Sequence, residues 1–125
     1  IENFETISKF IVLVKALGCK IAIDDFGTGY SNFEYLVKLK ADYIKIDGSL
    51  IKNIATDDKH RLIVETIVSF AKRIGIKTVA EFVSDEKILQ TIKEIGISCA
   101  QGYHIGKPET LVWKNYYLFF LVLHF

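Results

Sequence analysis

Short apolar stretches alternate along this chain with longer segments that have helical spacing. In residues 3–17, apolar side chains recur every three or four positions, which is the spacing of one helix face. These positions are Phe4, Ile7, Ile11 and Val14. The next stretch, Ile21 to Ile23, is short and apolar at every position, as in a strand that is buried on both faces. The pattern therefore predicts a helix followed directly by a buried strand.

A nine-residue pattern occurs three times and marks junctions between a helix and a strand. It reads KALGCKIAI from Lys15, KRIGIKTVA from Lys72 and KEIGISCAQ from Lys93. In each copy a lysine lies near the negative end of the helix dipole, and the glycine three residues later can end the helix. This internal repeat predicts three helices that each lead at once into a strand.

The segments between these repeats complete the alternation. A short helix is expected from Ser31 to Leu39, and a strand from Tyr43 to Ile46. A long helix begins at Asp57 or Asp58, and a further one at Ser84 or Asp85, because aspartate and serine cap helices well. The expected inward positions are Ile63, Ile67, Phe70 and Ile74 in the long helix, and Ile88, Leu89, Ile92 and Ile95 in the further one. The pattern as a whole predicts an α/β fold of parallel βα repeats.

Composition narrows the class of protein. The 125 residues are half apolar, which fits a single domain with its own core. The 16 basic and 15 acidic residues leave a net charge of +1 without a basic run, so no nucleic-acid polymer is expected as a partner. Cys19 and Cys99 lie in apolar, strand-like contexts, and we expect reduced thiols and a cytoplasmic location.

We see no signal peptide in the sequence. The longest apolar run, Tyr116 to Leu123, is eight residues, whereas about 20 are needed to span a bilayer, so no membrane insertion is expected. The chain starts at Ile1 and contains no methionine. We therefore expect it to be a piece of a longer protein.

Ionisable or amide side chains follow each of the four predicted strands. Asp24 and Asp25 close the first, Lys45 and Asp47 stand at the end of the second, and Glu81 ends the third. Because the carboxyl ends of parallel strands lie along one edge of the sheet, these side chains are expected to converge there. The fourth strand ends in Gln101.

This set of side chains suits metal-assisted hydrolysis of a phosphodiester. Paired carboxylates such as Asp24 and Asp25 are ligands for Mg²⁺ or Mn²⁺. Lys45 can neutralise a phosphate oxygen, and Glu81 can accept the proton of an attacking water. No serine or cysteine has a histidine partner at a suggestive place, which disfavours acyl transfer. Lys45 as a Schiff-base nucleophile is a further hypothesis, but it leaves both aspartates without a role.

Each of these side chains also has a simpler structural interpretation. The two aspartates could serve only a turn, Lys45 and Asp47 could form an ion pair with each other, and Glu81 could cap the next helix. His60, His104 and His124 lack the spacing of metal ligands and are interpreted as structural or solvent-facing.

Four strings in order, DDFGTGYSNFEYL, YIKIDGSLI, TVAEFVSDEKI and GISCAQGYHIGKP, strongly resemble the C-terminal half of EAL domains. These are the cyclic-di-GMP phosphodiesterases of bacterial signalling. The resemblance implies that residues 1–108 form the C-terminal half of a TIM-like (β/α) barrel. It also implies hydrolysis of cyclic-di-GMP to linear pGpG with Mg²⁺ or Mn²⁺. A GGDEF or sensory domain is an implied partner in the longer protein.

The resemblance assigns roles to the side chains at the strand ends. Metal binding is carried over to Asp24, Asp25 and Glu81, and catalysis to Lys45 and Glu81. The same transfer gives supporting roles, near the substrate or the attacking water, to Asp47 and Gln101.

The chain also departs from the family pattern. The glutamate-alanine-leucine motif and two further metal ligands belong to an earlier part of the barrel. Where the family reads AEGVE, Phe82 replaces the glycine and Ser84 the second glutamate. These changes keep open an alternative function, a catalytically degenerate module that binds cyclic-di-GMP or a protein partner.

The tail, residues 109–125, is more apolar than expected of the family. It is interpreted as a closing helix, an association surface or sequence foreign to the domain. Half a barrel exposes two sheet edges, so we expect either a homo-oligomer or docking of the missing N-terminal half.

Overall fold

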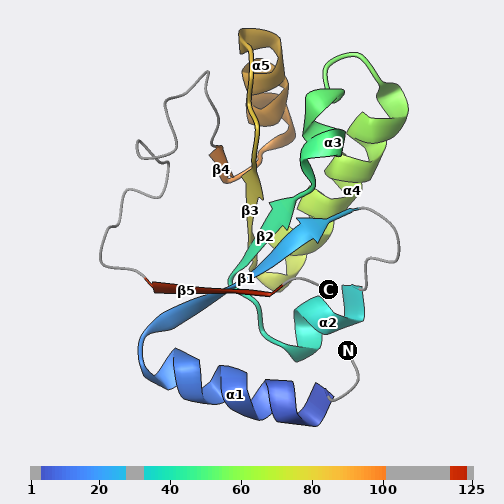
Figure 1. The fold of residues 1–125 in the computed structure, drawn as a ribbon. Coiled ribbons are helices and arrows are strands. Elements are labelled where there is room, and N and C mark those ends of the chain that lie inside the picture. Colours follow the sequence, from blue (N-terminus) through green and yellow to red (C-terminus); the bar gives the residue numbers. More distant parts are fainter. Residues whose placement is uncertain (1–3, 28–32, 101–118, 124–125) are drawn as a thin grey trace.

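A computed structural model describes residues 4–27, 33–100 and 119–123, and its elements alternate as expected (Figure 1). The helices are α1 (Phe4–Ala16), α2 (Phe33–Lys38), α3 (Gly48–Lys52), α4 (Asp58–Ile74) and α5 (Glu86–Ile95). The strands are β1 (Cys19–Phe26), β2 (Tyr43–Ile46), β3 (Lys77–Ala80), β4 (Cys99–Ala100) and β5 (Phe119–Leu123).

The strands form one parallel sheet in the order β4-β3-β2-β1-β5. From β1 to β4, strands that follow one another in the chain are neighbours in the sheet, as in a (β/α) barrel. Consecutive residues on β1 and β3 are buried, including Ile21 to Ile23 and Thr78 to Ala80, so both faces of the sheet are covered there. The α/β fold of parallel βα repeats is thereby confirmed.

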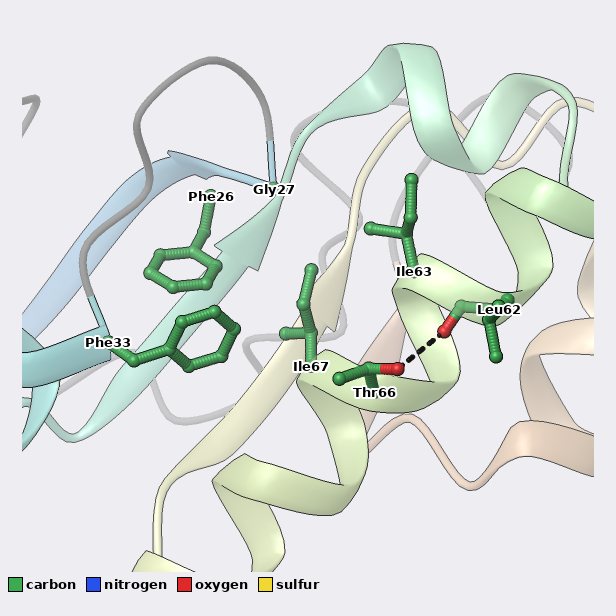
Figure 2. A pocket seen from close by; sticks show the side chains of 7 residues that line it. All are labelled: Phe26, Gly27, Phe33, Leu62, Ile63, Thr66 and Ile67. Atoms are coloured by element: carbon green, nitrogen blue, oxygen red, sulfur yellow. Dashed lines mark hydrogen bonds between the residues drawn. The ribbon is translucent and has the colours of Figure 1, made fainter.

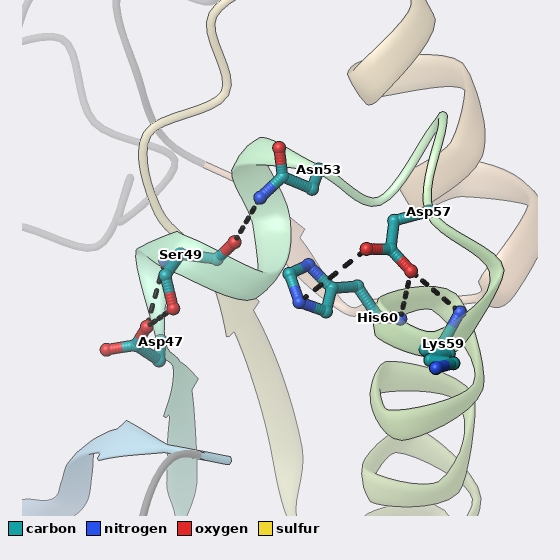
Figure 3. Close-up of polar contacts among 6 residues, drawn as sticks. All are labelled: Asp47, Ser49, Asn53, Asp57, Lys59 and His60. Atoms are coloured by element: carbon teal, nitrogen blue, oxygen red, sulfur yellow. Dashed lines mark hydrogen bonds and ion pairs between the residues drawn. The ribbon is translucent and has the colours of Figure 1, made fainter.

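Local signals in the sequence placed the helix ends correctly. The Asp57 carboxylate accepts hydrogen bonds from the backbone N–H groups of Lys59 and His60, at 2.9 and 3.2 Å (Figure 3). Asp85 caps α5 in the same way through the N–H of Ile88, at 2.8 Å. The helix ends at Gly75 and Gly96 are left-handed, with φ of 78° and 90°.

The predicted inward face of α4 is wrong in part. Ile67 is buried as expected, but Ile63 and Ile74 are 40% and 36% exposed. The other buried positions of the helix are Val64, Val68 and Ala71. Both sets have helical spacing, and the set with the smaller side chains packs inward. Which of the two sets faces inward depends on contacts with the neighbouring sheet, and the pattern within one helix does not reveal those contacts.

Two further elements differ from the expectation. Helix α3 directly follows β2 and was not predicted, because a helix of five residues has too few positions to show a period. In the tail, Phe119–Leu123 pairs with Cys19–Ile23 of β1 as a parallel strand. The closing helix considered for the tail is therefore not found over these five residues, while residues 109–118 lie outside the described ranges.

The described helices are α1 to α5. None of them is long and apolar enough to cross a bilayer.

Candidate active site

A bulge in β1 carries the two adjacent aspartates. Ile23 pairs with Ile44, and Phe26 pairs with Ile46, so β1 has one residue more than β2 between these two points. Asp24 and Asp25 both stand opposite Lys45 as a result. Asp25 has a φ of +49°, a left-handed conformation that aspartate tolerates better than most residues. Bulges of this kind re-aim side chains and are common beside active sites.

An ion pair joins the ends of β2 and β3. The Lys45 Nζ lies 2.5 Å from the Glu81 Oε1, and the two side chains are 19% and 13% exposed. Lys45 therefore pairs with Glu81 and not with Asp47, the partner that the simpler interpretation gave it. Glu81 does not cap the next helix either, because Asp85 does. The pair holds a cation and a carboxylate together at the carboxyl edge of the sheet.

Asp47 begins α3. Its carboxylate accepts a hydrogen bond from the backbone N–H of Ser49 at 2.9 Å and another from the Ser49 hydroxyl (Figure 3). These contacts fix the turn between β2 and α3, two residues after Lys45. Asp47 therefore holds the backbone next to the ion pair in place.

The proposed metal ligands are not all gathered in one group. Among residues 4–27, 33–100 and 119–123, no three Asp, Glu, His or Cys side chains lie close enough together to hold a metal ion. The oxygen donors of Asp24 and Asp25 suit a hard divalent cation by type. Glu81 is instead held by Lys45. The assignment of these three residues as metal ligands stays a prediction, and Gln101 lies outside the described residues.

Phe82 stands next to the ion pair in an unusual conformation. Its φ is +60°, and the residue is 66% exposed. A bulky residue with positive φ is a genuine outlier, and such strain concentrates at functional sites. In the sequence, Phe82 stood out only because it replaces a glycine of the family's AEGVE motif.

An apolar recess of about 370 Å³ lies between the carboxyl end of β1, α2 and α4 (Figure 2). Phe26, Phe33 and Ile67 turn their side chains toward it, as Figure 2 shows. The Thr66 hydroxyl on its wall donates to the backbone carbonyl of Leu62 at 2.8 Å. None of the seven described residues that line the recess carries a charge, so these residues offer no group for the predicted hydrolysis.

One of the three histidines, His60, lies in the described part of the chain. The His60 Nε2 lies 3.9 Å from the Asp57 Oδ2, beside the capped start of α4 (Figure 3). His104 and His124 lie outside the described ranges. Cys19 and Cys99 are free thiols and are partly buried.

Comparisons with known proteins agree with this architecture. The family model for the EAL domain matches residues 1–108. The chain is 41% identical over 111 residues to the cyclic di-GMP phosphodiesterase PdeB of Shewanella oneidensis. That alignment covers 89% of the chain and 13% of PdeB, so the chain spans only a small part of that relative's length.

Solved structures share the same arrangement of elements. The EAL domain of Mycobacterium smegmatis DcpA superposes with a TM-score of 0.79 at 33% identity, over 86% of this chain and 48% of DcpA. A manganese and cyclic di-GMP complex of Klebsiella pneumoniae BlrP1 superposes with a TM-score of 0.74, also at 33% identity. That match covers 81% of this chain and 26% of BlrP1.

Proposed function

Because this chain belongs to the EAL domain family, we propose that the whole protein of which it forms part hydrolyses cyclic di-GMP to linear pGpG. The observation that carries the proposal is the Lys45–Glu81 ion pair, which stands at the carboxyl edge of the sheet. The bulge with Asp24 and Asp25 lies opposite Lys45 on the neighbouring strand. A cation and several carboxylates at one sheet edge are the groups that phosphodiester hydrolysis requires.

Asp24, Asp25 and Glu81 are the residues that would hold a divalent cation, Mg²⁺ or Mn²⁺. The manganese in the BlrP1 complex and the oxygen donors on β1 support this assignment. When bound, such a cation neutralises charge on the phosphate and makes water a better nucleophile. The described residues bring no three such side chains together, and we propose that other segments of the whole protein supply further ligands.

The remaining chemistry belongs to Lys45 and Glu81. Lys45 neutralises the charge that grows on a phosphate oxygen as water attacks the phosphorus. Glu81 accepts the proton of that water, while the bond from phosphorus to the 3′ oxygen breaks and this oxygen takes a proton from solvent. Asp47 and Gln101 are supporting residues, Asp47 by fixing the turn after Lys45.

The test is release of pGpG from cyclic di-GMP by the whole protein, measured by chromatography with Mg²⁺ or Mn²⁺ and with a chelator. We expect turnover that the chelator abolishes, and a loss of at least about a hundredfold in kcat for Lys45→Met and Glu81→Gln. Lys38→Met, which changes an exposed lysine on α2, is the matched control. Absence of turnover in the wild-type protein would reject the proposal.

The isolated 125-residue chain is expected to show negligible turnover, because it carries too few of the metal ligands. The same chromatographic assay tests this. Release of pGpG by the isolated chain with Mn²⁺, if abolished by Asp24→Asn, would contradict the expectation.

A second candidate is a degenerate EAL module that binds cyclic di-GMP or a protein partner without hydrolysis. Phe82 and Ser84 favour it, since they replace the family's glycine and glutamate in the segment that holds Glu81. Calorimetry on the whole protein, run beside the hydrolysis assay, separates the two functions. Binding without pGpG release supports the degenerate module.

Partners and location are part of the same proposal. We place the protein in the cytoplasm of a bacterium, as a signalling enzyme with a GGDEF or sensory domain in the longer chain. The sheet edges at β4 and β5 further support association of two copies, and the edge at β4 supports docking of an N-terminal half. A monomeric mass of the isolated chain by sedimentation at micromolar concentration would rule out self-association.

A further inference from the structure

The Phe82 ring occupies an exposed place that ordinary packing does not explain. The residue is 66% exposed, although phenylalanine is among the most frequently buried residue types. Phe26 and Phe33, by contrast, pack edge to face with ring centroids 5.0 Å apart. Phe82 is also the residue whose backbone adopts a φ of +60°. Burial of the ring therefore does not offset the free-energy cost of the strained backbone at this position.

The ring is nevertheless held in place by a close contact. A Cβ atom added to Gly48 would lie 2.4 Å from the Phe82 Cδ2 and 2.9 Å from its Cε2. The ring thus rests directly on the backbone of Gly48, at the first residue of α3. With this support on one side and 66% exposure overall, much of the ring surface remains open to a ligand.

The supported ring lies at the edge that carries the proposed chemistry. Phe82 follows Glu81 in the chain, and Gly48 follows Asp47. The ion pair between Lys45 and Glu81 joins the same two strand ends. A flat ligand group on Phe82 would therefore be a neighbour of a phosphate at Lys45.

We propose that the Phe82 ring is the stacking surface for one purine base of the cyclic dinucleotide. This inference rests on the proposed function. In a nucleotide, one ribose separates the base from the phosphate, so a phosphate at Lys45 brings a base close to the neighbouring residues. Bases stack on aromatic side chains through their π faces, and loss of such a contact weakens binding by about ten- to a hundredfold.

The test compares Phe82→Leu, Phe82→Trp and Phe82→Gly in the whole protein with cyclic di-GMP as substrate. Stacking acts on the bound substrate and the transition state alike, so the leucine and glycine variants should raise KM by about ten- to a hundredfold and leave kcat nearly unchanged. The tryptophan variant keeps an aromatic face and should stay within about threefold of wild type.

Thermal unfolding of the same variants gives a second readout. Glycine adopts positive φ without strain, so Phe82→Gly should keep or raise Tm while KM rises. A ring that served only packing, or that another segment of the protein covered, would give a lower Tm and an unchanged KM, and this result would overturn the inference. If the wild-type protein does not hydrolyse cyclic di-GMP, the proposed function fails. If it does and Phe82→Leu has wild-type KM, only the stacking role fails.

Discussion

Removal of either partner of the Lys45–Glu81 pair should destabilise the fold measurably. The charged atoms are 2.5 Å apart, and the side chains are 19% and 13% exposed. Loss of one partner of a fully buried pair costs about 3–5 kcal/mol, and that of an exposed pair about 0–1 kcal/mol. At this intermediate burial we expect Lys45→Met and Glu81→Gln each to cost about 2 kcal/mol. The double variant should cost less than the sum of the two, by a coupling energy of about 1–2 kcal/mol.

The chain contains a matched control for this measurement. Lys38 and Glu34 on α2 are also 2.5 Å apart, but their side chains are 52% and 63% exposed. The variants Lys38→Met and Glu34→Gln should give a coupling energy of about 0.3–0.5 kcal/mol. Urea denaturation of the chain and of both sets of single and double variants provides these energies. Equal coupling in the two pairs would refute the view that partial burial strengthens the Lys45–Glu81 interaction.

Three further predictions follow from the caps and thiols. Asp85→Ala removes the cap of α5 and should cost about 1 kcal/mol in urea denaturation, whereas a cost no larger than that of Glu86→Ala would contradict the capping role. Hydrogen bonds from the backbone N–H groups of His60 and Lys59 lower the pKa of Asp57 below its ordinary 3.8. The stabilisation by the Asp57 carboxylate is complete well above pH 3.8 and is lost as the pH falls below 3.8 and through the lowered pKa. The difference in unfolding free energy between wild type and Asp57→Ala should therefore be constant near neutral pH and narrow below pH 3.8, and a difference that stays constant in acid would count against the capping role. Burial raises the pKa of the Cys99 thiol, so iodoacetamide at about pH 8 should alkylate it more slowly in the native chain than in urea, and equal rates would disprove this.

Local signals in the sequence were sufficient to predict where the helices begin and end. Asp57 and Asp85 cap through N–H groups two or three residues away, and Gly75 and Gly96 end their helices in left-handed backbone. All of these contacts lie within one turn of helix. They can be predicted without knowledge of the rest of the fold.

Contacts between strands could be identified only from the structure. Lys45 pairs with Glu81, 36 positions away in the chain, and not with Asp47, because parallel pairing of β2 and β3 brings their ends together. The bulge at Asp24 and Asp25 depends likewise on the register with β2. The sequence could therefore identify the residues at this edge, but it could not give their pairing.

Strand β5 determines which sides of the sheet remain available to other strands. β2 occupies one side of β1, and β5 occupies the other from Cys19 to Ile23. In a closed barrel the strand that precedes β1 in the chain takes this second side. The tail strand and a preceding strand are therefore mutually exclusive neighbours of β1, and barrel closure in the whole protein requires β5 to be displaced.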